Sequence, residues 1–227
     1  MTSPAIATTL LPIWIAGAGG HAKVVIETAR AAGGFLLVGV LDDDPDRIGT
    51  EVLGVPVRGA IDAATVDRLG MTNVMMVLAA GDNRARAHLA TRLDGLVRWA
   101  TLVHPSAVIA PSVQLGEGTV VFAGAVIQPD TVVGRNVIVN TAASIDHDCV
   151  VGDVAHVGPG ARLAGSVSVG VGAFLGIGST VVPGCRIGDW ATVGAGGVVV
   201  SDVPSGVVAK GVPARWAGQA SSRESLA

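Results

Sequence analysis

An aliphatic residue recurs at every sixth position from Val103 to Val199 without a gap. Gly often follows it, and a small or β-branched residue stands four positions after it. A helix needs a period of about 3.6 and hairpin sheets turn at irregular spacing, so neither fits. The pattern predicts a triangular parallel β-coil with three hexads per turn, stacked as in other solenoids. The ladder consists of Val103, Ile109, Leu115, Val121, Ile127, Val133, Val139, Ile145, Val151, Val157, Leu163, Val169, Leu175, Val181, Ile187, Val193 and Val199.

The composition agrees with such a coil and argues against several partners. Half of the 227 residues are apolar, 15% are charged and 32 are Gly, which suits a Gly-punctuated coil better than a helical bundle. A net charge of −3 without a basic run argues against nucleic acid. No apolar run reaches the ~18 residues of a membrane span, and residues 1–12 lack the basic start of a signal peptide. We therefore expect a cytoplasmic protein.

The two cysteines, Cys149 and Cys185, both fall on the small inward position of the hexad. They are separated by two coils of 18 residues, which correspond to roughly 9–10 Å at ordinary strand spacing. A disulfide requires less than about 7 Å between the Cα atoms. We expect both to be buried packing residues.

The N-terminal part, residues 12–100, predicts a small α/β domain with a parallel sheet, because strands and helices alternate. The expected strands cover 13–17, 36–41, 51–57 and 74–79, and the expected helices cover 24–32, 62–69 and 83–93. The predicted organisation is a Rossmann-like domain at 1–100, a β-helix domain at 101–204 and a C-terminal tail at 205–227.

The turn after the first strand has the G-x-G-x-x-G/A form, and Asp42 follows about 20 residues later. This form is typical of dinucleotide binding. The domain is only half of a full dinucleotide fold, and a coil follows it instead of a catalytic domain, so a nicotinamide site is the less favoured interpretation. Gly17, Gly19 and Gly20 allow main-chain N–H groups at a helix N-terminus to approach an anion.

Charged residues stand beside this turn. His21 and Lys23 would add charge-assisted hydrogen bonds to a diphosphate. Asp42 and Asp43 follow the second strand and would accept hydrogen bonds from a ribose or a base. The alternative for the aspartates is a solvated loop, which Pro45 favours.

One hexad departs from the Gly rule and places His147 and Asp148 two and three positions after Ile145. Both therefore fall on a corner of the coil, with their side chains pointing outwards. A carboxylate beside a histidine orients the ring and raises its proton affinity, which suits a general base. His156 lies half a coil further on and so on another face, which means that the two histidines would share a site only across an oligomer interface. The alternative is a pair of solvated corner histidines.

The motifs together resemble one family over nearly the whole chain. They are Gly17-Ala-Gly-Gly-His-Ala-Lys, the Leu-Asp-Asp-Asp strand end, the hexads, Asn140…His147-Asp148…His156, Gly178-Ser-Thr-Val-Val-Pro-Gly-Cys and Val208-Ala-Lys-Gly-Val-Pro-Ala-Arg. This set is similar to the sialic acid O-acetyltransferase-like (NeuD/PglD-type) family of hexapeptide acetyltransferases. The resemblance implies a left-handed β-helix and a homotrimer that binds acetyl-CoA between coils of neighbouring chains. It implies direct acetylation of the 4-amino group of a UDP- or GDP-linked amino sugar in bacterial surface-glycan synthesis, without a metal.

The resemblance also implies roles for individual residues. His147 would be the general base and Asp148 its carboxylate partner, where the family often has Glu. His156 and the Gly165 N–H would contact the acetyl group and its developing oxyanion. The CoA arm and phosphates would lie along Ile177, Ala195 (where Gly is common) and Lys210. The nucleotide sugar would bind at Gly19, Gly20, His21, Lys23, Asp42, Asp43, Gly81 and Asn140.

Three other functions remain open. O-acetylation of a free sugar such as sialic acid would not need the diphosphate turn. Zinc-dependent carbonic anhydrases share the coil but need three His ligands at one metal, and His104 is more than two coils from His147. A non-catalytic scaffold would keep the aliphatic ladder but would have no use for the His147–Asp148 corner.

Overall fold

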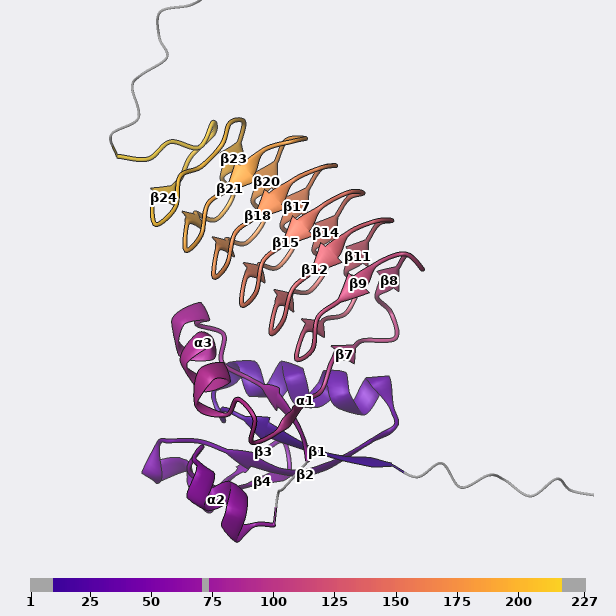
Figure 1. Cartoon of the computed structure of the whole chain (residues 1–227), viewed down its shortest axis with the longest axis vertical. Coiled ribbons are helices and arrows are strands. Elements are labelled where there is room, and N and C mark those ends of the chain that lie inside the picture. Colours follow the sequence, from indigo (N-terminus) through magenta and orange to yellow (C-terminus); the bar gives the residue numbers. More distant parts are fainter. Residues whose placement is uncertain (1–9, 71–73, 218–227) are drawn as a thin grey trace, which may run out of the picture.

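The computed structural model describes residues 10–70 and 74–217. Part of the expectations for the two ends of the chain, a start without a signal peptide and a tail at 205–227, concerns residues 1–9 and 218–227, which lie outside the described residues. An α/β domain forms one end of the molecule, and a long coil of stacked strands extends from it (Figure 1).

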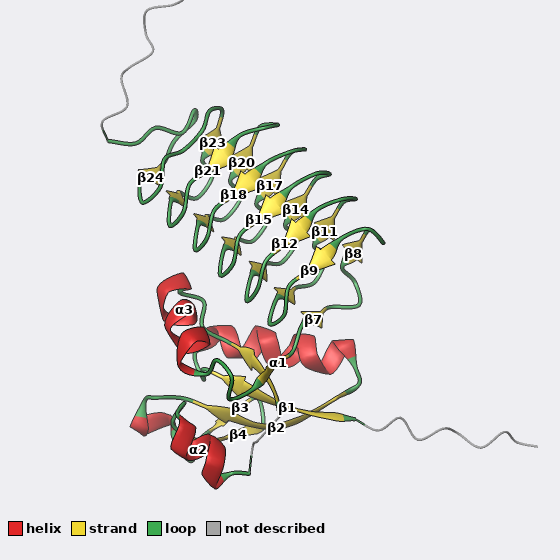
Figure 2. Ribbon diagram, in the orientation of Figure 1, coloured by secondary structure: helices red, strands yellow, loops and turns green. Residues whose placement is uncertain are grey.

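The α/β domain is built on one mainly parallel sheet, as predicted, although it has six strands where four were expected (Figure 2). Its neighbouring strands are parallel except for β3 and β4. The strands are β1 (Leu11–Ala16), β2 (Phe35–Leu41), β3 (Glu51–Val52), β4 (Val55–Gly59), β5 (Met75–Leu78) and β6 (Arg98–Trp99), in the order β3-β4-β2-β1-β5-β6. The helices are α1 (Gly20–Ala32), η1 (Pro45–Arg47), α2 (Ala63–Arg68) and α3 (Asn83–Arg92).

Local chemistry explains where these elements differ from the expected ones. The expected strand at 51–57 is an antiparallel hairpin, because Leu53 and Gly54 form a turn with φ of 48° and 77°. Helix α1 begins at Gly20, four residues earlier than expected, and includes most of the glycine-rich turn. Helix α3 begins where expected because the Asp82 side chain caps it by accepting from the Ala85 N–H at 2.8 Å.

The coil has three flat faces, and up to β23 paired strands are parallel and 18 residues apart, as in the pair Val121 and Val139. The first face contains β7 (Leu102–Val103), β10 (Val120–Val121), β13 (Ile138–Val139), β16 (His156–Val157), β19 (Phe174–Leu175), β22 (Thr192–Val193) and β24 (Val208–Ala209). The second contains β8 (Val108–Ile109), β11 (Val126–Ile127), β14 (Ser144–Ile145), β17 (Arg162–Leu163), β20 (Thr180–Val181) and β23 (Val198–Val199). The third contains β9 (Gln114–Leu115), β12 (Val132–Val133), β15 (Val150–Val151), β18 (Ser168–Val169) and β21 (Arg186–Ile187).

The interior of the coil is filled by the aliphatic ladder and by the small residues between its members. Cys149 and Cys185 are both buried there and unpaired, as expected, and burial raises the pKa of both thiols. The coil continues beyond residue 204, the expected end of its domain. Val203 pairs with Ile187, and β24 pairs with β22, although these residues lie outside the strict six-residue register.

The α/β domain packs on the first face of the coil. Outward side chains of this face, such as Val120 and Ile138, join Val25 and Ile26 of α1 in one buried apolar cluster. The corner between the second and third faces therefore lies on the side of the coil opposite this packing surface. Within the described ranges, no helix has the length and apolar character needed to cross a membrane.

Glycines at the corners set the spacing of the coils. A Cβ at Gly152 would stand 2.7 Å from the Val171 nitrogen of the next coil. We expect Gly152→Ala to lower the free energy of unfolding by about 1–3 kcal/mol, the cost of overpacking. Urea unfolding at matched protein concentration measures this. Gly20→Ala is the control, because nothing lies within 4 Å of its added Cβ, and an equal loss in both variants would contradict the close-approach explanation.

Candidate active site

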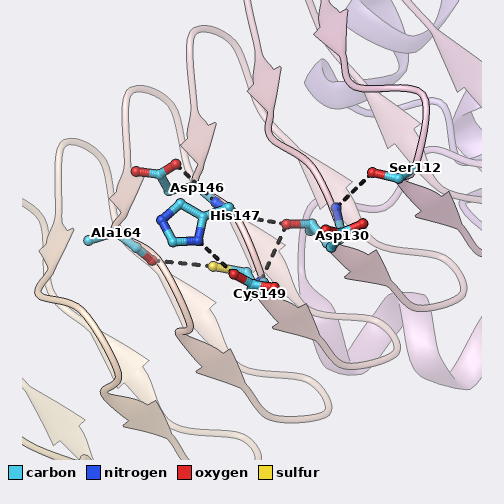
Figure 3. A network of polar contacts seen from close by, with 8 residues as sticks. Ser112, Asp130, Asp146, His147, Cys149 and Ala164 are labelled. Atoms are coloured by element: carbon cyan, nitrogen blue, oxygen red, sulfur yellow. Dashed lines mark hydrogen bonds and ion pairs between the residues drawn. The ribbon is translucent and has the colours of Figure 1, made fainter.

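His147 and Asp148 lie in the turn between β14 and β15, at the corner between the second and third faces, and 58% and 59% of their side chains are exposed. The Nδ1 atom of His147 is 2.7 Å from Oδ2 of Asp148. The His147 main-chain N–H donates to Oδ1 of Asp146 at 2.9 Å (Figure 3). The Asp148 carboxylate thus occupies the Nδ1 side of the ring, and Nε2 lies at the other edge. The hydrogen bond to Asp148 raises the pKa of His147, and the charge of Asp146 acts in the same direction.

Gly165 lies against the His147 ring, one coil further along the same corner. A Cβ at this position would stand 2.7 Å from Nε2 of His147, so a larger residue would displace the ring. The neighbouring Ser166 N–H donates to the His147 carbonyl at 2.9 Å, whereas the Gly165 N–H meets no acceptor within the described part of the chain. A main-chain N–H without an internal acceptor is the kind of donor that can stabilise a developing oxyanion.

A cavity of about 480 Å³ lies at the carboxyl ends of β1, β2 and β5. Gly17 lines it with φ of 113°, and a Cβ there would come within 3.2 Å of the Ala79 main chain, so only glycine fits this turn. Lys23 is exposed on α1 and does not line the cavity. The expected nucleotide-sugar residues that do line it are Gly19, Gly20, His21, Asp42, Asp43 and Gly81.

The two aspartates join the segments around this cavity. Asp42 accepts from the Ala18 N–H of the glycine turn at 2.5 Å. Asp43 accepts from the Ile61 N–H at 3.0 Å and pairs with Arg92 of α3 at 2.6 Å. These contacts order the loop that follows β2. Both carboxylates are therefore held in a defined position at the edge of the cavity.

Two cationic or titratable side chains of the cavity were not foreseen from the sequence. Arg47 of η1 lines it and lies 3.5 Å from Oδ2 of Asp42. His88 of α3 lines it as well. The sequence shows only that Arg47 follows the Asp run. If that run is a solvated loop, Arg47 is expected to be an ordinary surface residue.

His156 lies in the first face on β16, and only 8% of it is exposed. Its Nδ1 is 3.3 Å from the Gly81 carbonyl oxygen, its Nε2 is 2.9 Å from Nδ2 of Asn140, and the His21 ring lies 6.3 Å away. A second cavity of about 400 Å³ opens beside it, between the start of α3 and the first face. Within one chain, His156 therefore adjoins the α/β domain, whereas His147 lies at the opposite corner.

The residues expected along the CoA arm form one line at the corner between the first and second faces. Ile177, 61% exposed, and Ala195 occupy equivalent positions on consecutive coils. Lys210 follows on the next coil, where a Cβ added at Gly194 would lie 3.1 Å from its own Cβ. Asn140 lies at the same corner two coils earlier.

Comparison with known proteins identifies the family. The PglD N-terminal domain family matches residues 12–93. PerB from Caulobacter crescentus, solved with CoA and GDP-perosamine, is 46% identical, with a TM-score of 0.84, over 96% of this chain and 100% of that one. The chain belongs to the PglD-type family of hexapeptide acetyltransferases.

Further members of the PglD-type family are also similar. The acetyltransferase domain of PglB from Neisseria gonorrhoeae FA1090, solved with acetyl coenzyme A, is 36% identical, with a TM-score of 0.85, over 91% of this chain and 99% of that one. The UDP-N-acetylbacillosamine N-acetyltransferase of Bacillus subtilis (strain 168) is 42% identical over 109 residues, so the match spans 47% of this chain and about half, 49%, of that curated relative. The matches confirm the predicted fold class, a Rossmann-like domain followed by a left-handed β-helix.

The contact between His147 and Asp148 leads to a testable prediction about the pKa of His147. Asp148→Asn removes the acceptor charge at Nδ1, so we expect the pKa of His147 to fall toward its ordinary value. An NMR titration of the ring protons measures it. Asp146→Asn is the matched control, since Asp146 acts on the ring only through its charge and should lower the pKa less. Equal decreases in both variants, or none in Asp148→Asn, would contradict the assignment.

Proposed function

We propose that this chain transfers an acetyl group from acetyl-CoA to the 4-amino group of a nucleotide-linked amino sugar. The observation that carries the proposal is that one chain contains both a cavity at a glycine-rich turn and the His147–Asp148 corner with its Gly165 N–H. The likeness to PerB, solved with GDP-perosamine, favours a GDP-linked sugar. A UDP-linked sugar is the second candidate, because the Bacillus relative is named for one.

In the proposed reaction, the sugar amine attacks the thioester carbonyl carbon of acetyl-CoA. Nε2 of His147 takes a proton from the amine as the C–N bond forms, and Asp148 stabilises the resulting imidazolium through Nδ1. The Gly165 N–H donates to the oxyanion of the tetrahedral intermediate. When the C–S bond breaks, the CoA sulfur leaves as a thiolate and receives the proton from His147, which restores the free base without an acyl-enzyme.

The two substrates have separate places in this proposal. The diphosphate lies at the start of α1, where Gly19 and Gly20 offer N–H groups, with His21 and Arg47 beside it. Lys23 would reach it from the exposed side of α1. The ribose and base bind toward Asp42, Asp43 and Gly81. CoA follows the corner line of Ile177, Ala195 and Lys210, with Asn140 and His156 near its acetyl end.

The separation of the cavity from His147 supports a homotrimer in which each active site is composed of residues from two protomers. We call the cavity at the glycine-rich turn the nucleotide cavity. In one chain it lies in the α/β domain, which packs on the first face, while His147 lies at the opposite corner. The cavity of one protomer would then face His147 of a neighbour. A cytoplasmic location and a role in surface-glycan synthesis belong to the same proposal.

An acetyl-CoA consumption assay with GDP- and UDP-linked 4-amino sugars tests the function. We expect turnover with one of them, reduced about 10²-fold or more in His147→Ala. His104→Ala is the matched control, because His104 is also a corner histidine but its ring is hydrogen-bonded to Ser106 and not to a carboxylate. Equal activity of wild type and His147→Ala would remove the proposed base, and activity only on a free hydroxylated sugar would favour the O-acetyltransferase alternative.

Mixed oligomers test whether sites are composite. Gly20→Glu places a carboxylate near the proposed diphosphate position, and its Cβ would have no atom within 4 Å. We expect it and His147→Ala to be inactive separately. When co-expressed in equal amounts they should recover about one quarter of the wild-type rate, the fraction of sites that combine two intact halves across an interface. No recovery in oligomers shown to contain both chains would contradict the composite site.

A further inference from the structure

Arg86 of α3 is the one large charged side chain in the described part of the chain that is buried, at 1% exposed, and the proposed mechanism does not use it. Its guanidinium bonds only to carbonyl oxygens. Nε donates to Asn136 O at 2.9 Å, Nη1 to Ala80 O at 3.0 Å and Gly81 O at 3.4 Å, and Nη2 to Asn83 Oδ1 at 2.8 Å, Val154 O at 2.6 Å and Ala155 O at 3.2 Å. All five N–H donors of the planar group are thereby used, which a lysine ammonium cannot reproduce.

Arg86 and Asn83 together form a clasp between the α/β domain and the coil. Nδ2 of Asn83 donates to the Gly172 carbonyl at 3.0 Å. Asn136, Val154 and Gly172 follow one another at intervals of 18 residues, so the clasp reaches three consecutive coils at the corner between the third and first faces. The loop of Ala80 and Gly81, which lines the nucleotide cavity, is bonded to the same guanidinium.

The clasp continues into His156. The Gly81 carbonyl that accepts from Arg86 also lies 3.3 Å from Nδ1 of His156. The Asn140 Oδ1 accepts from the Thr141 N–H at 2.8 Å, which orients the amide so that its Nδ2 donates to Nε2 of His156 at 2.9 Å. Nε2 is therefore an acceptor and Nδ1 a donor, which defines one neutral tautomer.

The electrostatic surroundings favour this neutral ring. Burial first, and then the positive charge of Arg86, lower the pKa of His156 to about 3, with His21 acting in the same direction and the Gly81 hydrogen bond opposing it. Burial and Arg86 also lower the pKa of His21 to about 4. Burial lowers the pKa of Arg86 itself to about 10, with the charge of Asp82 opposing the decrease, so Arg86 remains cationic at neutral pH.

We propose that Arg86 is a positioning residue. It holds the Gly81 carbonyl against Nδ1 of His156 and so keeps that ring as the tautomer protonated on Nδ1. Nε2 of this tautomer accepts from the Asn140 amide at the corner where the proposed CoA line lies. Only the kinetic consequence of this assignment rests on the proposed function. His156 then acts as a neutral link between the nucleotide cavity and the coil rather than as a proton donor.

Side-chain ¹⁵N NMR of histidine-labelled protein, with the five histidines assigned by single His→Gln variants, reads the tautomer directly. In the wild type we expect His156 to carry its proton on Nδ1. Arg86→Lys keeps the cation but loses the planar five-donor fork, so we expect a mixture of tautomers. In the acetyl-transfer assay kcat should fall about 10-fold or more, the effect of a small misplacement, while KM for the nucleotide sugar changes less than about threefold because the diphosphate contacts remain.

Leu93→Val is the matched control, because Leu93 is fully buried in the α/β domain core at the end of the same helix and lies outside the clasp. It should lower thermal stability while leaving the His156 tautomer and kcat unchanged. A wild-type ring protonated on Nε2, an unchanged tautomer or kcat in Arg86→Lys, or an equal loss of kcat in Leu93→Val would overturn the proposal. A wild type that acetylates no nucleotide sugar would count against the proposed function alone, since the NMR result still decides the tautomer.

Discussion

Main-chain hydrogen bonds between consecutive coils determine where every candidate functional side chain of the coil lies. The Val120 N–H donates to Val137 O and the Phe122 N–H to Val139 O, both at 2.9 Å, and this pattern repeats along each face. Because the repeat is 18 residues, equivalent positions of successive coils stack into straight lines. One corner line carries His147 and Gly165, another carries Ile177 and Ala195, and the third offers carbonyls to α3. A coil of different length would separate all of these pairs.

The third corner line has a second consequence, because its carbonyls are what the α/β domain binds. Arg86 and Asn83 of α3 reach three of them, and the apolar side chains of α1 cover the adjoining first face. The nucleotide cavity is thereby fixed next to His156 and on the side of the coil away from His147. In a single chain the cavity at the glycine-rich turn and the His147–Asp148 corner are therefore far apart, which is why the proposed function includes an oligomer.

The sequence was sufficient for the parts that depend on local pattern. The period of six predicted the coil and the inward positions of Cys149 and Cys185, and the position of His147 in its hexad predicted an exposed corner. The glycine turn predicted an anion site at the start of a helix, and a cavity lies at that place. The positions of Arg86 and Arg47 were not predictable from the sequence. An arginine on an amphipathic helix or in an Asp-rich loop is expected to be solvated, and only its tertiary neighbours show otherwise. The burial of His156 likewise depends on which face the α/β domain covers, and no local signal specifies that face.

A crystal structure of the protein with CoA and a GDP-linked 4-amino sugar tests the central claim most directly. The account predicts that the diphosphate lies at Gly19 and Gly20 of one protomer. It predicts that the sugar amine lies within hydrogen-bond reach, about 3.2 Å or less, of Nε2 of His147 from a neighbouring protomer. An amine held against His147 of its own chain, or against no histidine of either chain, would contradict it.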